Sequence, residues 1–481
     1  MSKIGEKKLG LFPLVFFAMG CMLASGVFTL SGDFAAAGAY TLATIIGWGI
    51  TFVGMIALTM CYYRLSMAKP ELTSGIYSYA RAGFGSYIGF NAAWGYWMSA
   101  VLALVSYCVA FFGNLGGIFP VFGGGANVVS VICSSVILWL FVLLLLRGVN
   151  QAIIINAFVL IAKIIPIIFL LIAGIFAGAL QWDVFVDNFA GAGSGMSLFD
   201  QVKATIFTTV WIFIGIEGAV VISGRAKDTK VAGNATVISF IALFLLYFII
   251  SLLSMGVLPH DELVELPWPS MAGVMAAIVG PWGGMLVNVA VFISIGGALF
   301  TYVILATDSA FGPADQGCFP SIFSRKNKNN APTYSIIFSA VLVEAFLIIA
   351  LLNDAAFQSC YYLSTISIMI PYMLSAFYTL KCCGNGEILN GLSGGGKAWA
   401  WIFAILGSIY GVWMLYASSI AYVLVCALLY APGIVLYILR RREENDGPIF
   451  PKAYDKVVAA ILIIMFVVAI VLLARGTINP F

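Results

Sequence analysis

The chain has 481 residues, of which 62% are apolar and only 9% are charged. Soluble domains carry about 25% charged residues, so this composition excludes a soluble protein and predicts an all-α polytopic membrane protein. The nine cysteines include no CxxC pair and lie mostly in apolar segments, so neither a metal ion nor a disulfide is implied.

A membrane-spanning helix needs about 20 apolar residues, and thirteen segments meet this length. In chain order the predicted spans are residues 11–31, 38–63, 84–119, 127–146, 151–182, 201–222, 235–258, 284–310, 334–352, 355–380, 398–416, 418–440 and 454–474. The polar stretches between them are loops, so we expect one transmembrane domain over residues 1–481. Spans one to five (11–182) and six to ten (201–380) form two sets of five, and three spans follow (398–474). Because five is odd, the second set runs inverted relative to the first, as in an inverted repeat.

Lysine and arginine gather in alternate loops, which the positive-inside rule assigns to the cytoplasm. The basic side includes Lys7, Arg225 and Arg441, whereas the opposite loops carry mainly acidic residues such as Asp33 and Glu262. We therefore expect a multi-pass protein of the cell membrane with a cytoplasmic N-terminus.

Two predicted spans are interrupted at their centres by small residues. Span one contains Ala24-Ser25-Gly26, and span six contains Ile214-Gly215-Ile216-Glu217-Gly218. Broken backbone is tolerated in the middle of the bilayer only where it lines a cavity. Breaks at corresponding positions of two repeats predict a substrate site at the midplane. Free N–H groups in span one suit a carboxylate and free carbonyl groups in span six suit an ammonium group, so an amino acid fits both.

Three ionisable residues lie well inside the predicted spans, namely Lys163, Glu217 and Glu344. Each costs about 2.5–3.5 kcal/mol at a helix centre, which makes it a functional candidate. For Glu217, holding a proton, pairing with a cationic substrate and anchoring a helix contact all stay open. Lys163 lies about 18 Å from the cytoplasmic end of span five at 1.5 Å per residue. This depth favours a coupling role, in which the ammonium replaces a bound cation or releases a proton.

The remaining candidates are less specific. Glu344 has no nearby break, so a helix contact or an oligomer interface is expected. Trp211 precedes the span-six break by one helical turn, where its ring would cover a substrate or form a cation–π contact. Tyr96 and Trp97 lie in the middle of span three, where core packing is the ordinary role, and Tyr96 is also a candidate for gating.

Three motifs carry a resemblance to a known family. Ala24-Ser25-Gly26-Val27-Phe28 resembles the G-S-G-V-F motif of the amino acid, polyamine and organocation carriers, and residues 211–217 resemble their W-x-F-I-G-x-E motif. Residues 70–77 are similar to the P-x-x-G-G-x-Y loop, with Ser74 in place of the first glycine. The resemblance is to the basic amino acid/polyamine antiporter branch and covers nearly the whole chain. It implies a leucine-transporter-type 5+5 inverted repeat with 12 core helices, here followed by a thirteenth.

The resemblance also implies roles for individual residues. Ser25 and Gly26 would bind the substrate carboxylate, Ile214 would offer a carbonyl to the α-amino group, and Trp211 would stack over the side chain. The residues that would complete the pocket are Met22, Ser99, Ala100 and Ser364. Lys163 matches a lysine that takes the place of a sodium ion in related carriers, which argues against sodium coupling.

The chain departs from the arginine/agmatine exchangers of this family at three pocket positions. Those exchangers carry two asparagines and a tryptophan where this chain has Cys21, Leu104 and Ala298. Tyr302, one turn beyond Ala298, is a candidate for the missing aromatic wall and for gating. The length and the thirteenth span are more like the arginine/ornithine exchangers and the precursor/product exchangers for lysine or histidine.

The sequence therefore predicts a secondary active antiporter that exchanges an external cationic amino acid for an internal amino acid or its metabolic product. A proton-coupled uptake permease is the alternative. A channel would need a continuous polar lining and an enzyme would need a catalytic constellation, and neither pattern is visible. The expected partners are amino acid substrates and the lipid bilayer, without a nucleic acid or a cofactor. The sequence leaves the oligomeric state open, with a homodimer among the options.

Overall fold

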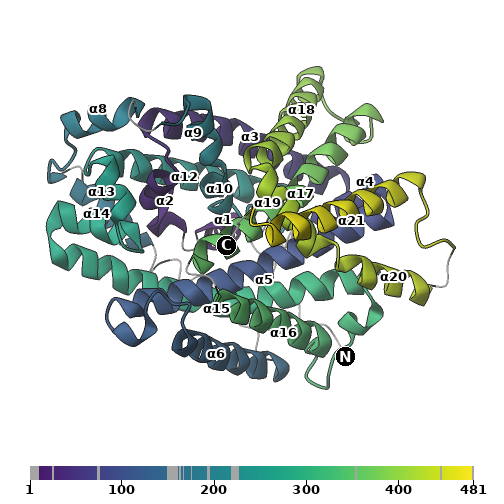
Figure 1. Ribbon diagram of the computed structural model, residues 1–481. Coiled ribbons are helices and arrows are strands. Elements are labelled where there is room, and N and C mark those ends of the chain that lie inside the picture. The colour runs from purple at the N-terminus through teal and green to yellow at the C-terminus, as the bar shows by residue number, and fades with distance from the viewer. Residues whose placement is uncertain are drawn as a thin grey trace.

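The structure is a computed structural model that describes residues 10–23, 26–72, 76–148, 161, 164–165, 167–174, 176–191, 195–217, 227–352, 355–444 and 447–478. Within these ranges the regular structure is helical, apart from an isolated bridge between Lys326 and Pro332. In the part of the chain that the structure describes, ten helical segments are long and apolar enough to cross a membrane, with Ile420–Glu444 taken as one, and this confirms the predicted all-α membrane class (Figure 1). Ser25, Lys163 and Gly218 lie outside the described residues.

Most long helices coincide with predicted spans. They are α3 (Thr41–Ala68), α5 (Ser86–Gly116), α6 (Val128–Leu146), α12 (Thr229–Met255), α15 (Pro281–Asp315), α16 (Thr333–Ala350), α17 (Ala356–Gly384), α18 (Gly394–Ala417) and α21 (Ala453–Ala474). The shorter connecting helices include α4 (Ile76–Phe84), α8 (Trp182–Ala190), α9 (Leu198–Ala204), α13 (His260–Glu265) and α14 (Ser270–Val279). Much of predicted span five lies outside the described residues.

The backbone confirms both predicted interruptions. Span one consists of α1 (Leu11–Met22), the 3-10 turn η1 (Gly26–Phe28) and α2 (Leu30–Ala36). In span six, α10 (Ile206–Trp211) is followed by turns over residues 212–217. Within these turns Gly215 has a φ of 99°, a conformation that glycine adopts without steric cost. Small residues at these two positions therefore end the helices near the middle of otherwise apolar segments.

One sequence prediction needs correction, and one predicted span contains a break that the sequence analysis did not expect. Predicted span twelve is present, because Ile420–Glu444 is long and apolar enough to cross a membrane, but Ala431-Pro432 divides it into α19 (Ile420–Tyr430) and α20 (Gly433–Glu444). Proline has no N–H to donate and disrupts a helix interior, which accounts for the break. Asp33 does not lie in a loop. It lies in α2, where its Oδ2 atom accepts a hydrogen bond of 2.6 Å from the Thr29 hydroxyl.

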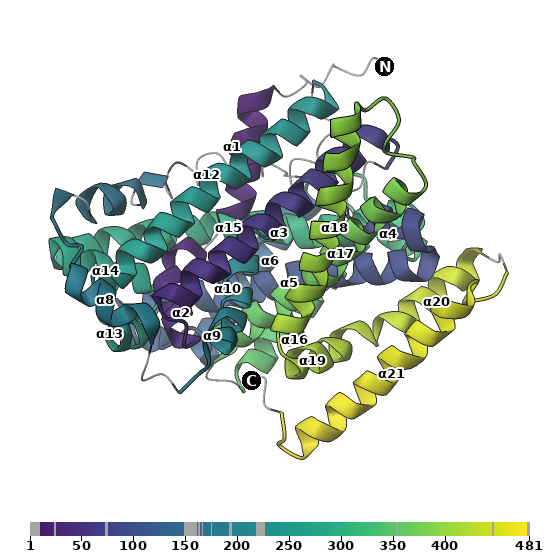
Figure 2. The ribbon, with the colours of Figure 1, turned by 90° about the horizontal axis from the view of Figure 1, so that it is seen from above.

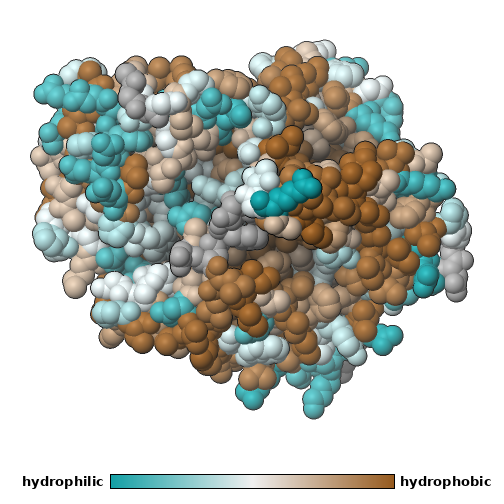
Figure 3. All heavy atoms as spheres, in the orientation of Figure 1, coloured by the Kyte–Doolittle hydropathy of each residue, from teal (hydrophilic) through white to brown (hydrophobic). Residues whose placement is uncertain are grey.

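Helix α5 forms the centre of the molecule and α21 lies at its edge (Figures 1 and 2). In the most apolar 18-residue window of each helix, 89% of the α5 residues and 11% of the α21 residues are buried. Hydrophobic side chains dominate the surface over α21, whereas hydrophilic side chains gather over α8 and α13 (Figure 3). Apolar side chains are stable at the surface of a helix bundle when lipid replaces water around it.

Candidate functional site

The two interrupted spans touch each other at their breaks. A β-carbon added at Gly26 would lie 2.7 Å from Ile212 Cγ2 and 3.0 Å from Trp211 Cδ1. A β-carbon added at Gly215 would lie 3.0 Å from the carbonyl carbon of Cys21. Each break thus contains a glycine that packs directly against the other break. The structure therefore brings the two predicted halves of the site together.

Side chains from α12 and α14 hold the two flanks of the span-one break. The Tyr247 hydroxyl donates to the Met22 carbonyl at 3.3 Å, where α1 ends. On the other flank, Ser270 Oγ donates to the Thr29 carbonyl and accepts from Gly32 N–H, both at 3.1 Å. Helix ends leave backbone groups without intrahelical partners, and these side chains satisfy some of them. The break is thereby supported without a continuous helix.

The span-six break is a run of tight turns. Ile214 N–H donates to the Trp211 carbonyl at 3.1 Å, and Ile216 N–H donates to the Phe213 carbonyl at 3.0 Å. Among the residues that the structure describes, no backbone N–H donates to the Ile214 carbonyl. This carbonyl is the group that the sequence analysis assigned to the α-amino group of a substrate. Ser25, the partner assigned to the carboxylate, lies outside the described residues.

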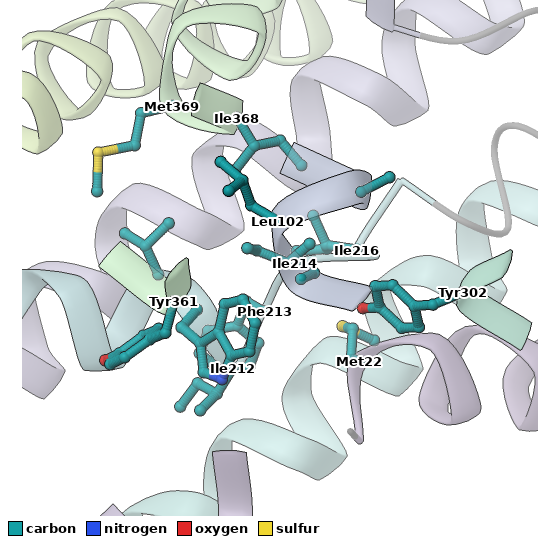
Figure 4. Close-up of a cluster of buried hydrophobic side chains, with 14 of the residues drawn as sticks. Met22, Leu102, Ile212, Phe213, Ile214, Ile216, Tyr302, Tyr361, Ile368 and Met369 are labelled. Atoms are coloured by element: carbon teal, nitrogen blue, oxygen red, sulfur yellow. The ribbon is translucent and has the colours of Figure 1, made fainter. Parts of the chain in front are cut away.

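Four aromatic rings form a wall beside the breaks, and we call this group the aromatic wall. Trp211 is only 5% exposed, and its ring centroid lies 4.9 Å from that of Tyr361 and 5.8 Å from that of Tyr107. Tyr107 in turn packs edge-on against Tyr302 at 4.7 Å. Tyr302 lies beside Met22, with Ile214 close by (Figure 4). Tyr302 is therefore part of a group of rings near the end of α1, and its role as a wall of the substrate pocket stays a prediction.

Glu217 connects the span-six break to two neighbouring helices. The side chain is 2% exposed, and its two carboxyl oxygens have different partners. Tyr96 on α5 donates to Oε1 at 3.0 Å, and Tyr372 on α17 donates to Oε2 at 2.6 Å. Two hydrogen bonds from different helices satisfy a buried carboxyl group that would otherwise be costly in an apolar environment. We call Glu217, Tyr96 and Tyr372 the carboxyl brace.

Two of the predicted pocket residues bond to each other. The Ser99 and Ser364 hydroxyls lie 3.1 Å apart, and Ser364 Oγ also donates to the Ser99 carbonyl at 2.8 Å. Both side chains are buried at the contact between α5 and α17, and Ala100 is buried next to Ser99. Their polar groups are thus already paired within the protein. The geometry assigns them to the helix contact behind the breaks.

The sequence analysis missed four tyrosines of this centre, namely Tyr107, Tyr247, Tyr361 and Tyr372. Two of them had a usable signal. Tyr107 follows Tyr96 by eleven residues and Tyr372 follows Tyr361 by eleven, a spacing that returns to the same helix face after three turns. On α5 and α17 these faces also carry Ser99 and Ser364, so the predicted pocket residues and the missed tyrosines share one side of each helix.

Glu344 lies away from the breaks, on the contact between α6 and α16. The Ser135 hydroxyl donates to Glu344 Oε1 at 2.5 Å and also contacts the Val131 carbonyl at 2.9 Å. Glu344 therefore takes part in a contact between two helices, which is one of the two roles that the sequence analysis expected for it.

An all-helical membrane chain with two broken spans that meet at a buried, aromatic centre belongs to the class of secondary transporters with discontinuous helices. Comparison with known proteins gives the family. Residues 9–417 match the family model for amino acid permeases. The chain therefore belongs to the amino acid permease family, and it is a transporter rather than an enzyme.

Several relatives match over almost their entire length. An arginine/ornithine antiporter of Pseudomonas aeruginosa is 38% identical over 471 residues, which cover 96% of this chain and 97% of that protein. An arginine/ornithine antiporter of Latilactobacillus sakei is 34% identical, with 98% of each chain covered. An L-lysine transport protein of Corynebacterium glutamicum is 33% identical, with 98% of this chain and 97% of that protein covered.

Proposed function

We propose that this protein is an amino acid antiporter that exchanges external arginine, or a related cationic amino acid, for internal ornithine by alternating access. The observation that carries the proposal is the direct contact between the two helix breaks beside the aromatic wall. The names of the relatives support the substrate pair, since two are arginine/ornithine antiporters and a third transports L-lysine.

The breaks supply complementary groups for the two ends of an amino acid. The backbone at the start of η1, at Gly26, is the proposed partner of the substrate carboxylate, and Ser25, outside the described residues, is expected to bind it as well. The Ile214 carbonyl accepts a hydrogen bond from the α-ammonium group. Trp211 covers the side chain, and its ring face attracts a cation electrostatically. The neighbouring Tyr302 and Tyr107 extend this aromatic surface, which compensates for neutral residues elsewhere in the pocket.

Selectivity for a cationic side chain must come from aromatic faces in this protein. Cys21, Leu104 and Ala298 occupy the positions where arginine/agmatine exchangers have polar or aromatic residues, and the last two are buried apolar side chains. A buried cation–π contact contributes about 2 kcal/mol or more, enough to discriminate a cation from a neutral side chain more than tenfold. The aromatic wall is therefore the proposed selectivity element.

Coupling is proposed to involve Lys163 and the carboxyl brace. Glu217 does not face the substrate in this arrangement, because both of its oxygens accept hydrogen bonds from tyrosines. Its role is to hold the broken helix against α5 and α17, with Tyr96 acting as a gate residue. For Lys163, which lies outside the described residues, the proposed role is to replace a bound cation, so that exchange needs no sodium.

Counterflow in proteoliposomes tests this proposal. Vesicles loaded with ornithine, lysine, histidine, agmatine, cadaverine, histamine or a neutral amino acid are given labelled arginine outside. We expect arginine uptake only with a cationic amino acid inside, most rapidly with ornithine, and no response to an imposed proton gradient. Uptake into empty vesicles that is driven by a proton gradient would instead establish the alternative, a proton-coupled uptake permease. The buried carboxyl group of Glu217 at the span-six break is the feature that favours proton-coupled uptake, because it could carry a proton.

The membrane orientation, the repeat boundaries and the oligomeric state belong to the same proposal. We place the N-terminus in the cytoplasm because lysine and arginine concentrate on that side of the predicted topology. We place the repeats at residues 11–182 and 201–380, and we propose a homodimer. Labelling of single introduced cysteines from either side of intact cells tests the orientation. The mass of the purified protein in lipid nanodiscs tests the dimer.

A further inference from the structure

A groove separate from the helix breaks lies between the 3-10 turn η4 (Ser321–Ser324), α16 and α20, and it has a volume of about 730 Å³. Its apolar lining includes Tyr334, Ile337, Phe338 and Val341 on α16, and Leu436 and Leu439 on α20. We call it the basic-side groove, because it opens beside loops of the predicted basic face.

The apolar lining forms a continuous stripe along α16. Tyr334, Ile337, Phe338 and Val341 follow the spacing i, i+3, i+4, i+7, which places them on one helix face. Each of them is at least 39% exposed, so the stripe stays open along the groove even though Phe338 also contacts Trp97 and Phe323. From Tyr334 to Val341 the stripe extends about 10 Å along the helix axis. An apolar stripe of this length suits the part of a lipid acyl chain that lies nearest to the head group.

The mouth of the groove carries an excess of positive charge. Arg325, after η4, and Arg442, near the end of α20, both line the groove and are exposed. The acid that lines it, Glu443, is already engaged, because its Oε2 accepts from Ser321 N–H at 2.8 Å and pairs with Arg440 at 3.3 Å. Two arginines are therefore available to an anion at the mouth.

The two walls of the groove are tied to each other. In addition to the contact between Ser321 and Glu443, Arg440 Nε donates to the Gly317 carbonyl at 3.1 Å. Both bonds join α20 to the segment that leads from α15 into η4. Hydrogen bonds from side chains of α20 to the backbone at Gly317 and Ser321 thus hold the segment before Arg325 close to the helix that carries Arg442.

We propose that the basic-side groove binds an anionic glycerophospholipid. The phosphodiester lies between Arg325 and Arg442, and one acyl chain runs along the apolar stripe of α16. Basic pockets between membrane helices on the cytoplasmic side suit anionic head groups, and arginine binds phosphate oxygens through paired donors. A free phosphate would leave the apolar stripe uncovered, and a zwitterionic lipid would bring a second positive charge to the arginines.

Native mass spectrometry of the full-length protein tests the site. The protein is purified with phosphatidylglycerol or phosphatidylcholine of the same acyl chains, and retained lipids are counted. We expect phosphatidylglycerol to be retained in preference to phosphatidylcholine. The double variant Arg325→Ala/Arg442→Ala should lower retention about tenfold. The control Lys328→Ala/Lys397→Ala removes the same charge from exposed residues outside the groove and should leave retention unchanged.

A second variant separates the apolar requirement from the charge. Val341→Trp fills the stripe and keeps both arginines, so it should also lower phosphatidylglycerol retention, even if the arginine double variant fails to fold. Competition by inorganic phosphate with no lipid retained would identify a free-phosphate site and overturn the proposal. Equal retention in all variants, or a wild-type dimer that the arginine variant converts to monomers, would overturn it as well. Counterflow in phosphatidylcholine vesicles measures transport separately, so either proposal can fail alone.

Discussion

Trp211, the last residue of α10, contacts the rings of both Tyr361 and Tyr107. Both ring pairs are tilted, at 60° and 44°, and such contacts constrain the orientation of Trp211 because aromatic pairs favour defined geometries. A rigid ring beside the breaks can distinguish a cationic side chain from a neutral one, because the face of the ring attracts a cation. Among single residues, Trp211 is therefore both fixed by its aromatic neighbours and close to the helix breaks.

Replacing Trp211 with leucine should raise the apparent KM for arginine about tenfold, because a cation–π contact is lost. Trp211→Phe, which keeps an aromatic face, should retain most of the affinity. Trp97→Leu is the matched control, since Trp97 is fully buried and donates to Ser339 at 2.9 Å away from the breaks. It should lower stability without changing KM. Initial rates of counterflow at several arginine concentrations measure the effect, and an unchanged KM in Trp211→Leu would contradict the proposed role.

The carboxyl brace leads to a second prediction for single residues. Tyr372→Phe removes one hydrogen bond to a buried acid, a loss of about 1.5–3 kcal/mol if the acid is charged. We expect exchange to slow by about tenfold or more. Tyr430→Phe removes a comparable buried bond to α17, the 2.8 Å contact with the Ser367 carbonyl, and should cost stability without slowing exchange per folded molecule. Equal rates in the two variants would show that the brace acts only in folding.

At the scale of elements, the breaks work as a pair. Gly26 and Gly215 allow two chain segments from distant parts of the sequence to approach within van der Waals contact. Neither segment could approach so closely as a regular helix with larger side chains. The turns of span six and the 3-10 turn of span one are therefore parts of one structural unit.

Gly26→Ala tests this unit. The added methyl group would lie 2.7 Å from Ile212 Cγ2, so one of the two segments must move. We expect a loss of about 1–3 kcal/mol in stability, as for other overpacked sites, together with impaired exchange. The control is Gly49→Ala in α3, where no atom lies within 4 Å of the added carbon. It should leave exchange unchanged, and stability should stay the same or rise slightly. Thermal unfolding and counterflow measure the two effects. Normal exchange by Gly26→Ala would show that the contact is not needed for transport.

The contact between α6 and α16 illustrates a different role for an acid within a predicted span, here the half-buried Glu344. Glu344 bonds to Ser135 rather than to a residue of the breaks. Glu344→Gln keeps an acceptor for that bond, so stability should change by no more than about 1 kcal/mol and exchange should stay within about twofold of wild type. Glu217→Gln, measured in the same assay, should slow exchange strongly. A similar loss of exchange in both variants would mean that Glu344 also takes part in coupling.

At the scale of the whole molecule, burial decreases from α5 at the centre to α21 at the edge. The residues of the breaks, the aromatic wall and the carboxyl brace lie on segments up to α17, and the family match ends at residue 417. Helix α21 packs against α19, and Tyr454 near its start donates to the Phe84 carbonyl at 2.5 Å. These contacts lie outside the breaks, the aromatic wall and the carboxyl brace.

A variant that ends after Glu444 tests the role of α21. Arginine/ornithine exchange should stay within about twofold of wild type, because no residue of the site is removed. The melting temperature should fall by a few degrees, since packing against α19 and the bond to α4 are lost. Counterflow and thermal unfolding in the same lipid measure both. Loss of exchange with an unchanged melting temperature would assign a transport role to the thirteenth span.

The sequence by itself determined the class of protein and the location of both breaks. Apolar segments about 20 residues long leave few alternatives in lipid, because unpaired backbone groups are too costly there. Small residues within such segments mark breaks for the same reason. The motifs around Gly26 and Trp211 then indicated the family and the kind of substrate.

Only the tertiary structure decided which side chains surround the breaks. Tyr107, Tyr361 and Tyr372 lie on helices that are equally apolar on several faces, so hydrophobicity alone does not show which face points inward. The structure also paired Ser99 with Ser364 and gave Glu217 its two tyrosine partners. These contacts join residues 121 to 265 positions apart in the chain. They depend on how whole helices pack, which no local pattern in the sequence specifies.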